Sequence, residues 1–151
     1  MEDIASGLHV HSPATLKRYR MLFISAAWWN WLVALVSLFA DKEIRSFLGM
    51  PPLTNSLNLH LSASCIWLLG IGYYWIARDV SRNHAIAKLG MIGKLAVFAI
   101  FLGHLIAGDI PFGLAAPAAI DLIFAVLFLE FLVRMRDAEG NAAGNPADSG
   151  V

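Results

Sequence analysis

Five side chains that could do chemistry lie within apolar stretches of this chain. They are Asn30, His60, Lys94, His104 and Asp121. A polar or ionisable group inside a membrane span is costly, so it usually faces other helices and has a partner there. Together with Asp109, which follows the third apolar stretch, these residues are predicted to form a ligand-binding pocket.

His60 and His104 lie near corresponding ends of their apolar stretches, so the two imidazoles are expected at similar depth and close together. Neutral imidazole is a common metal ligand, and two histidines on neighbouring helices can hold haem iron from both sides. The pair is therefore a candidate metal site, with haem b as one cofactor and hydrogen-bonded interface histidines as the alternative. No Cys-x-x-Cys-His motif for covalent haem is present, and no cofactor is favoured.

Asp121 lies about ten residues into the fourth apolar stretch, on the order of 14 Å deep, with no cation beside it in the sequence. An unpaired carboxylate at that depth is expensive. We therefore expect Asp121 to face protein or a water-filled cavity and never lipid, with Asn30 as its first partner. It serves either as a proton or ligand site or as a structural hydrogen-bond acceptor.

Lys94 has a long stem that could reach the membrane surface, or it could pair with Glu130. Glu130 follows Asp121 by nine residues, so at about 100° per residue the two point to opposite sides of one helix. For Glu130 the favoured partner is Arg134, one turn later. Both acids cannot face one narrow bundle axis. Either Glu130 extends to the membrane surface, or its side of the helix contacts another copy of the chain in a homo-oligomer.

The elements that must position these residues are four apolar runs. Of the 151 residues, 58% are hydrophobic and 15% are charged, against about 45–50% and about 25% in soluble domains. A helix needs about 20 apolar residues to cross a membrane, and lipid forces each span to satisfy its own backbone hydrogen bonds. The sequence therefore predicts an all-α integral membrane four-helix up-down bundle with spans at Met21–Ala40, Leu57–Ala77, Ala85–Gly108 and Phe112–Val133.

The distribution of Lys and Arg predicts the orientation of the bundle. One side carries Lys17, Arg18, Arg20, Arg78, Arg82, Lys88, Arg134 and Arg136, whereas the other carries only Lys42 and Arg45. The positive-inside rule then places both termini in the cytoplasm, and the expected location of the bundle is the inner membrane. The expected organisation is a cytoplasmic segment 1–20, a transmembrane domain 21–136 and a disordered cytoplasmic tail 137–151. The first span is expected to be retained rather than cleaved as a signal peptide.

Other features narrow the function classes. Eleven basic residues balance eleven acidic ones, so charge does not favour a nucleic-acid partner. A phosphate-binding glycine loop and a Gly-x-Ser-x-Gly motif are both missing, which argues against a soluble type of enzyme. The linker segment Ile44–Met50 is apolar and is read either as a short amphipathic helix on the membrane surface or as a packed loop.

Two stretches, Gly70–Arg82 and Leu89–Leu95, resemble small uncharacterised four-helix bacterial membrane proteins and are loosely similar to the DoxX-like group. The resemblance implies a four-helix membrane bundle, and some members of that group are linked to quinone-dependent oxidation. It supplies no catalytic pattern that maps onto residues of this chain.

Three function classes follow. The favoured one is a non-enzymatic membrane protein that sits among membrane lipids and binds or moves a lipid, quinone or other apolar small molecule through an intramembrane polar and aromatic pocket. The alternatives are a haem- or quinone-linked redox subunit and an accessory or assembly protein that acts by helix contacts.

Overall fold

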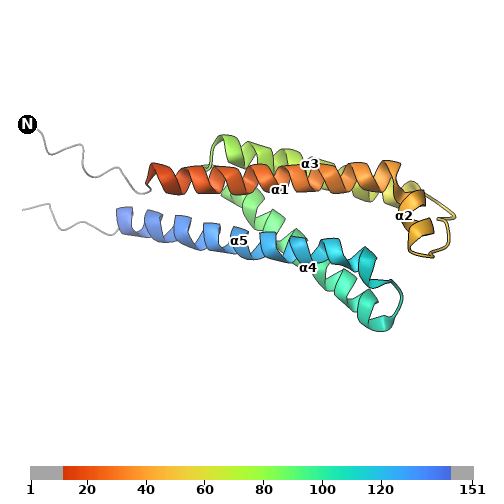
Figure 1. Cartoon of the computed structure of the whole chain (residues 1–151). Coiled ribbons are helices and arrows are strands. Elements are labelled where there is room, and N and C mark those ends of the chain that lie inside the picture. Colours follow the sequence, from red (N-terminus) through yellow and green to blue (C-terminus); the bar gives the residue numbers. More distant parts are fainter. Residues whose placement is uncertain (1–11, 144–151) are drawn as a thin grey trace, which may run out of the picture.

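The computed structural model describes residues 12–143, and within them the chain is helical with no strands. Four long helices, α1 (Pro13–Phe39), α3 (Leu57–Arg78), α4 (His84–Ala107) and α5 (Phe112–Ala143), alternate in direction (Figure 1). All four contain segments long and apolar enough to cross a membrane. The predicted four-helix membrane bundle is therefore confirmed, and the protein is a multi-pass membrane protein by the length and composition of its helices.

The helix bounds differ from the apolar runs mainly at the ends near the termini. Helix α1 begins at Pro13, eight residues before the predicted span, because Ser12 caps it by accepting a hydrogen bond from the Thr15 amide. Proline at the first helical position suits this start. Helix α5 continues to Ala143, into the segment 137–151 that the sequence predicts to be a disordered tail. Residues 1–11 and 144–151, which include His9 and His11, lie outside the described part of the chain.

The linker after α1 is neither a plain loop nor a span. It begins with a short helix, α2 (Asp41–Phe47), in which Arg45 donates to Asp41 over 2.9 Å. No residue of α2 is buried, which does not fit the expectation of a packed loop. Its end approaches the start of α5, since a Cβ on Gly113 would meet the Leu48 side chain at 3.0 Å.

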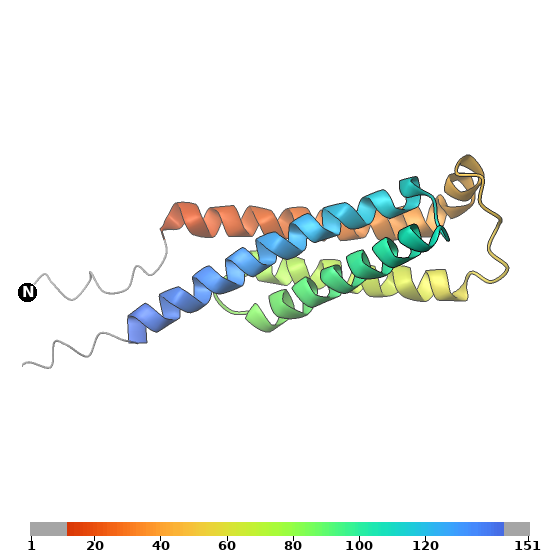
Figure 2. The ribbon, with the colours of Figure 1, turned by 90° about the horizontal axis from the view of Figure 1, so that it is seen from below.

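The long helices associate as two antiparallel pairs. Helix α1 packs mainly on α3, and α4 packs mainly on α5, with fewer contacts between the pairs. The α4–α5 pair is an antiparallel hairpin, in which α4 ends at Gly108 in the left-handed conformation at φ 79°. Figures 1 and 2 show the pairs crossing, and in Figure 1 they separate toward the end that carries α2.

Close approach of α1 to α3 depends on small residues. A Cβ on Gly70 would meet the Trp31 side chain at 2.5 Å and the Ala27 carbonyl oxygen at 3.3 Å. Ala26, Ala27 and Ala34 on α1 are essentially unexposed. In lipid, where apolar burial gives little drive for association, such small-residue faces allow the van der Waals packing that joins helices.

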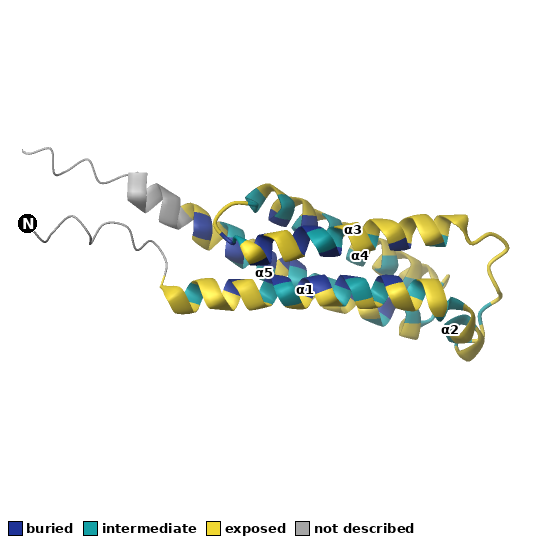
Figure 3. Cartoon of the chain, turned by 90° about the horizontal axis from the view of Figure 1, so that it is seen from above, coloured by how far each residue is buried: buried dark blue, intermediate teal, exposed yellow. Residues whose placement is uncertain are grey.

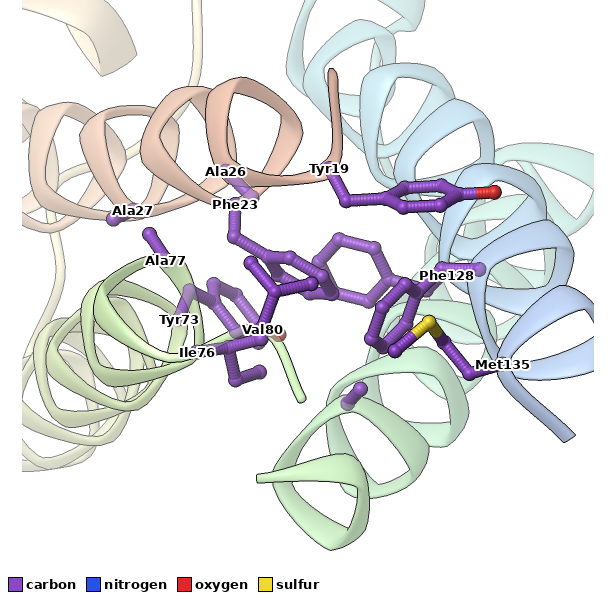
Figure 4. Close-up of a cluster of buried hydrophobic side chains, with 12 residues drawn as sticks. Tyr19, Phe23, Ala26, Ala27, Tyr73, Ile76, Ala77, Val80, Phe128 and Met135 are labelled. Atoms are coloured by element: carbon purple, nitrogen blue, oxygen red, sulfur yellow. The ribbon is translucent and has the colours of Figure 1, made fainter. Parts of the chain in front are cut away.

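The aromatic core, drawn in Figure 4, occupies the half of the bundle nearer the termini, where the cartoon of Figure 3 shows buried positions on several helices. Phe23 of α1 contacts Phe128 and Phe131 of α5 at ring-centroid distances of 4.8 and 4.9 Å. Tyr73 of α3 meets Phe128 edge to face at 5.1 Å. This cluster fills the space between the pairs at one end of the bundle. At the other end, the described residues form no comparable cluster of buried side chains.

Candidate functional site: a cleft that ends at a buried ion pair

A cleft of about 660 Å³ lies between the two helix pairs and receives residues from all four long helices. Its lining is mostly apolar, and four of its polar side chains are hydrogen-bonded to one another. The residues that line it are Trp29, Asn30, Val33, Ser37, Leu59, Leu61, Ser62, Ala63, Cys65, Ile66, Leu69, Tyr73, Gly93, Lys94, Val97, Phe101, Pro117, Ala118 and Asp121.

The polar part of the cleft, which we call the polar floor, consists of Trp29, Asn30, Lys94 and Asp121. Lys94 donates from Nζ to Asp121 Oδ1 and, over 3.0 Å, to Asn30 Oδ1. The Trp29 indole donates from Nε1 to the same Asp121 oxygen over 3.3 Å. Asn30 is fixed in turn, because its Nδ2 donates to the carbonyl oxygen of Ile66 over 3.2 Å. The polar floor therefore joins α1, α4 and α5 to one another, and α1 to α3.

Lys94 and Asp121 form a buried ion pair. The Lys94 side chain is 5% exposed and the Asp121 side chain 19% exposed. Lys94 also lies over the rings of Tyr73 and Phe124, at 5.7 and 5.2 Å from the ring centroids. Such cation–π contacts add attraction to a desolvated ammonium. A buried charge needs these partners, because desolvation is repaid only by good geometry and further hydrogen bonds.

Lys94 and Asp121 have partners that differ from those expected. Lys94 neither reaches the membrane surface nor pairs with Glu130, since its Nζ is bound to Asn30 and Asp121. Asp121 does face protein, as expected, and it shares the Lys94 ammonium with Asn30 rather than meeting Asn30 directly. The predicted association of Asn30, Lys94 and Asp121 in one site is thus present, with Lys94 at its centre.

Glu130 lies outside this site. It pairs with Arg134 of its own helix at 3.1 Å, as predicted, and also with Arg18 of α1 at 3.1 Å. The second contact was not foreseen, because Arg18 precedes the predicted first span. Since α1 supplies a partner for Glu130, the orientation of Glu130 no longer suggests contact with another copy of the chain.

The histidines lie apart from the cleft lining. His104 is exposed and its Nδ1 is 2.8 Å from Asp109 Oδ2, so these two predicted site residues form a pair at the end of α4. His60 is exposed on α3, and within 12–143 its ring has no hydrogen bond or ion pair. No group of three or more His, Cys, Asp or Glu residues that could hold a metal occurs among the residues described.

Tyr73 and Trp29 are parts of the site that the sequence did not reveal. Three consecutive aromatic residues near the end of a span are typical of anchors at the membrane interface, yet Tyr73 is unexposed, whereas Tyr74 and Trp75 are exposed. The Tyr73 hydroxyl is buried without a hydrogen-bond partner among the described residues. Trp29 directly precedes Asn30 in the sequence. An indole N–H donor next to a mid-span asparagine is the signal that could have identified Trp29 as part of the site.

Outside the spans, the turn between α3 and α4 holds a tightly bonded aspartate. Asp79 Oδ1 accepts hydrogen bonds from the Ser81 hydroxyl at 2.7 Å and the Ser81 amide at 3.2 Å. These bonds and the nearby Arg82 hold the pKa of the Asp79 carboxyl below its ordinary value. These hydrogen bonds stabilise the conformation of the turn, which lies at the same end of the bundle as the aromatic core.

Comparisons with known proteins leave this geometry as the main guide to function. No family model, curated protein or solved structure matches the chain.

Proposed function

We propose that the protein is an inner-membrane protein that binds or moves a lipid, quinone or other apolar small molecule in the cleft between its two helix pairs. The observation that carries this proposal is the cleft itself, which is lined by all four spans and ends at the buried Lys94–Asp121 pair. Small-molecule sites typically have roughly 300–1,000 Å³, apolar walls and a few placed polar groups. The cleft has these properties.

The proposed orientation puts both termini in the cytoplasm. The starts of α1 and α4 and the ends of α3 and α5 carry eight Lys and Arg residues, against two in the α2 region. This bias supports the orientation through the positive-inside rule. The aromatic core would then face the cytoplasmic leaflet, and the wider part of the cleft the outer leaflet. Reporter fusions at each terminus should both give a cytoplasmic signal, and a periplasmic signal from either would overturn this orientation.

Filling the cleft tests the proposed binding. Gly93 and Gly103 both lie on α4, and a Cβ built on either meets nothing within 4 Å. Only Gly93 lines the cleft. Gly93→Phe should therefore occupy the cleft, whereas Gly103→Phe adds the same ring and the same gain in helix propensity elsewhere on the helix.

The measurement is native mass spectrometry of protein purified from membranes. We expect an apolar molecule to be retained by the unchanged protein and by Gly103→Phe, and to be lost from Gly93→Phe. Equal retention by both variants, with intact folding by circular dichroism, would show that the bound molecule lies elsewhere. Absence of any retained molecule from the unchanged protein would argue against the proposed function.

A further inference from the structure

The polar floor has hydrogen-bonding capacity that the protein does not use. Asp121 accepts both of its bonds, from Lys94 and Trp29, at Oδ1. Its Oδ2 accepts none from residues 12–143. Lys94 has three N–H donors, and Asn30 and Asp121 take two of them. One carboxylate oxygen of Asp121 and one N–H of Lys94 therefore have no hydrogen-bond partner within residues 12–143.

The polar floor also carries no net charge. Lys94 and Asp121 cancel as an ion pair, and they would cancel equally if the proton moved from one to the other. The other polar side chains in the lining are those of Trp29, Asn30, Ser37, Ser62, Cys65 and Tyr73, residue types that are uncharged near neutral pH. A ligand with a net charge would therefore bring an uncompensated charge into a site whose charged groups are 5% and 19% exposed.

Resting on the proposed function, we propose that the cleft selects an uncharged amphiphile whose head carries a hydroxyl group. The hydroxyl donates to Asp121 Oδ2 and accepts from the third Lys94 N–H, which matches both unused groups at once. The apolar tail lies along the α4 side of the cleft, against Val97 and Phe101. Carboxylate and ammonium heads are disfavoured, because each lacks either the donor or the acceptor and adds a charge.

Cys65 provides the readout. It is the only cysteine of the chain, it is exposed, and it lines the cleft. The rate at which N-ethylmaleimide labels Cys65 in nanodiscs of zwitterionic lipid reports whether the cleft is occupied. The matched control is Cys65→Ala combined with Ile100→Cys, because Ile100 is 59% exposed on α4 outside the lining. Labelling there should not depend on the probe.

Three probes with the same twelve-carbon chain isolate the head group: dodecanol, dodecanoate and dodecylammonium. We expect dodecanol to protect Cys65 at a membrane mole fraction at least about tenfold lower than either charged probe, because burying an unpaired charge is expensive. Preferential protection by a charged probe, or equal protection by all three, would overturn this inference while leaving a cleft that binds apolar molecules. Failure of every probe to protect Cys65 in folded protein would count against the proposed function as well.

Variants that change the net charge of the polar floor provide a second test of the head-group preference. Asp121→Asn leaves a cationic polar floor and should shift the preference to dodecanoate, whereas Lys94→Gln leaves an anionic one and should shift it to dodecylammonium. Preferences that do not follow the charge of the polar floor would overturn the inference. If Lys94→Gln fails to fold, the Asp121→Asn arm alone decides, since the amide oxygen introduced by that substitution can still accept a hydrogen bond from Lys94.

Discussion

Removing the carboxylate of Asp121 should cost far more stability than removing both members of the ion pair. In Asp121→Leu the Lys94 ammonium stays 5% exposed and keeps Asn30 as its one hydrogen-bond acceptor among the described residues. Breaking a buried pair typically costs about 3–5 kcal/mol. Because Asn30 remains and the cleft can admit water, we expect about 3 kcal/mol, the lower end of that range.

The paired variant Lys94→Met/Asp121→Leu should recover most of this loss. Replacing both charges by apolar side chains of similar size is often neutral or stabilising. Here Trp29 loses its acceptor and Asn30 loses a donor, so a cost of about 1 kcal/mol should persist. Lys94→Met alone leaves Asp121 with Trp29 and 19% exposure, and should cost about 2 kcal/mol because the cleft solvates part of the carboxylate.

The assay is reversible unfolding of the four proteins in bicelles, by steric trapping or by titration with a denaturing detergent. The quantity of interest is the coupling energy of the double-mutant cycle, which separates the pair from effects on either side chain alone. The costs expected for the two single variants and for the double variant correspond to about 4 kcal/mol of favourable coupling. Additive single variants, or a double variant less stable than Asp121→Leu, would refute the account of Lys94 as a buried cation that depends on Asp121.

Two further predictions concern other parts of the fold. Gly90→Ala should lower stability by about 1–3 kcal/mol, because its Cβ would lie 2.5 Å from the Tyr73 ring; Gly93→Ala, which meets nothing within 4 Å, should be neutral or slightly stabilising in the same unfolding assay. Ser81→Ala should raise the pKa of Asp79 toward its ordinary value of 3.8, measured by NMR titration of the carboxyl. A carboxyl whose pKa is lower in the folded than in the unfolded protein stabilises the folded state above the unfolded pKa, and this stabilisation is lost as the pH falls through the folded pKa. The Ser81→Ala variant should therefore lose this stabilisation above about pH 4. An unchanged Asp79 titration, or equal effects of the two glycine variants, would contradict these assignments.

Sequence was sufficient for the spans because lipid leaves few alternatives. An apolar run of spanning length must form a helix, so the four runs specified four helices and their order. The start of α1 was missed because Lys17, Arg18 and Arg20 lie outside the apolar run although they continue the helix. The Ser12–Pro13 pair, a cap residue followed by proline, is the signal that marks this start.

The sequence predicted the depth of the site residues in the membrane better than the direction in which each side chain points around its helix axis. Counting along a hairpin gives the depth of each residue below the turn, and Lys94 lies fourteen residues before Gly108 while Asp121 lies ten after Pro111. The difference of four residues is about 6 Å of helix rise, which the long Lys94 side chain can span. That count could have identified Lys94 as the partner of Asp121. The contact of Glu130 with Arg18 depends on how the two helix pairs cross. The spacing of residues within a single helix does not predict that crossing.

The placement of the ion pair on one hairpin has a consequence for how the chain enters the membrane. Lys94 and Asp121 are 27 residues apart, on the two arms of the α4–α5 pair. An Asp or Lys at the centre of a span costs roughly 2.5–3.5 kcal/mol during insertion. Because both charges belong to consecutive spans joined by a tight turn, they can neutralise each other as soon as the hairpin leaves the translocon, before it meets the α1–α3 pair. Trp29 and Asn30 then receive an already neutral pair when the two hairpins assemble.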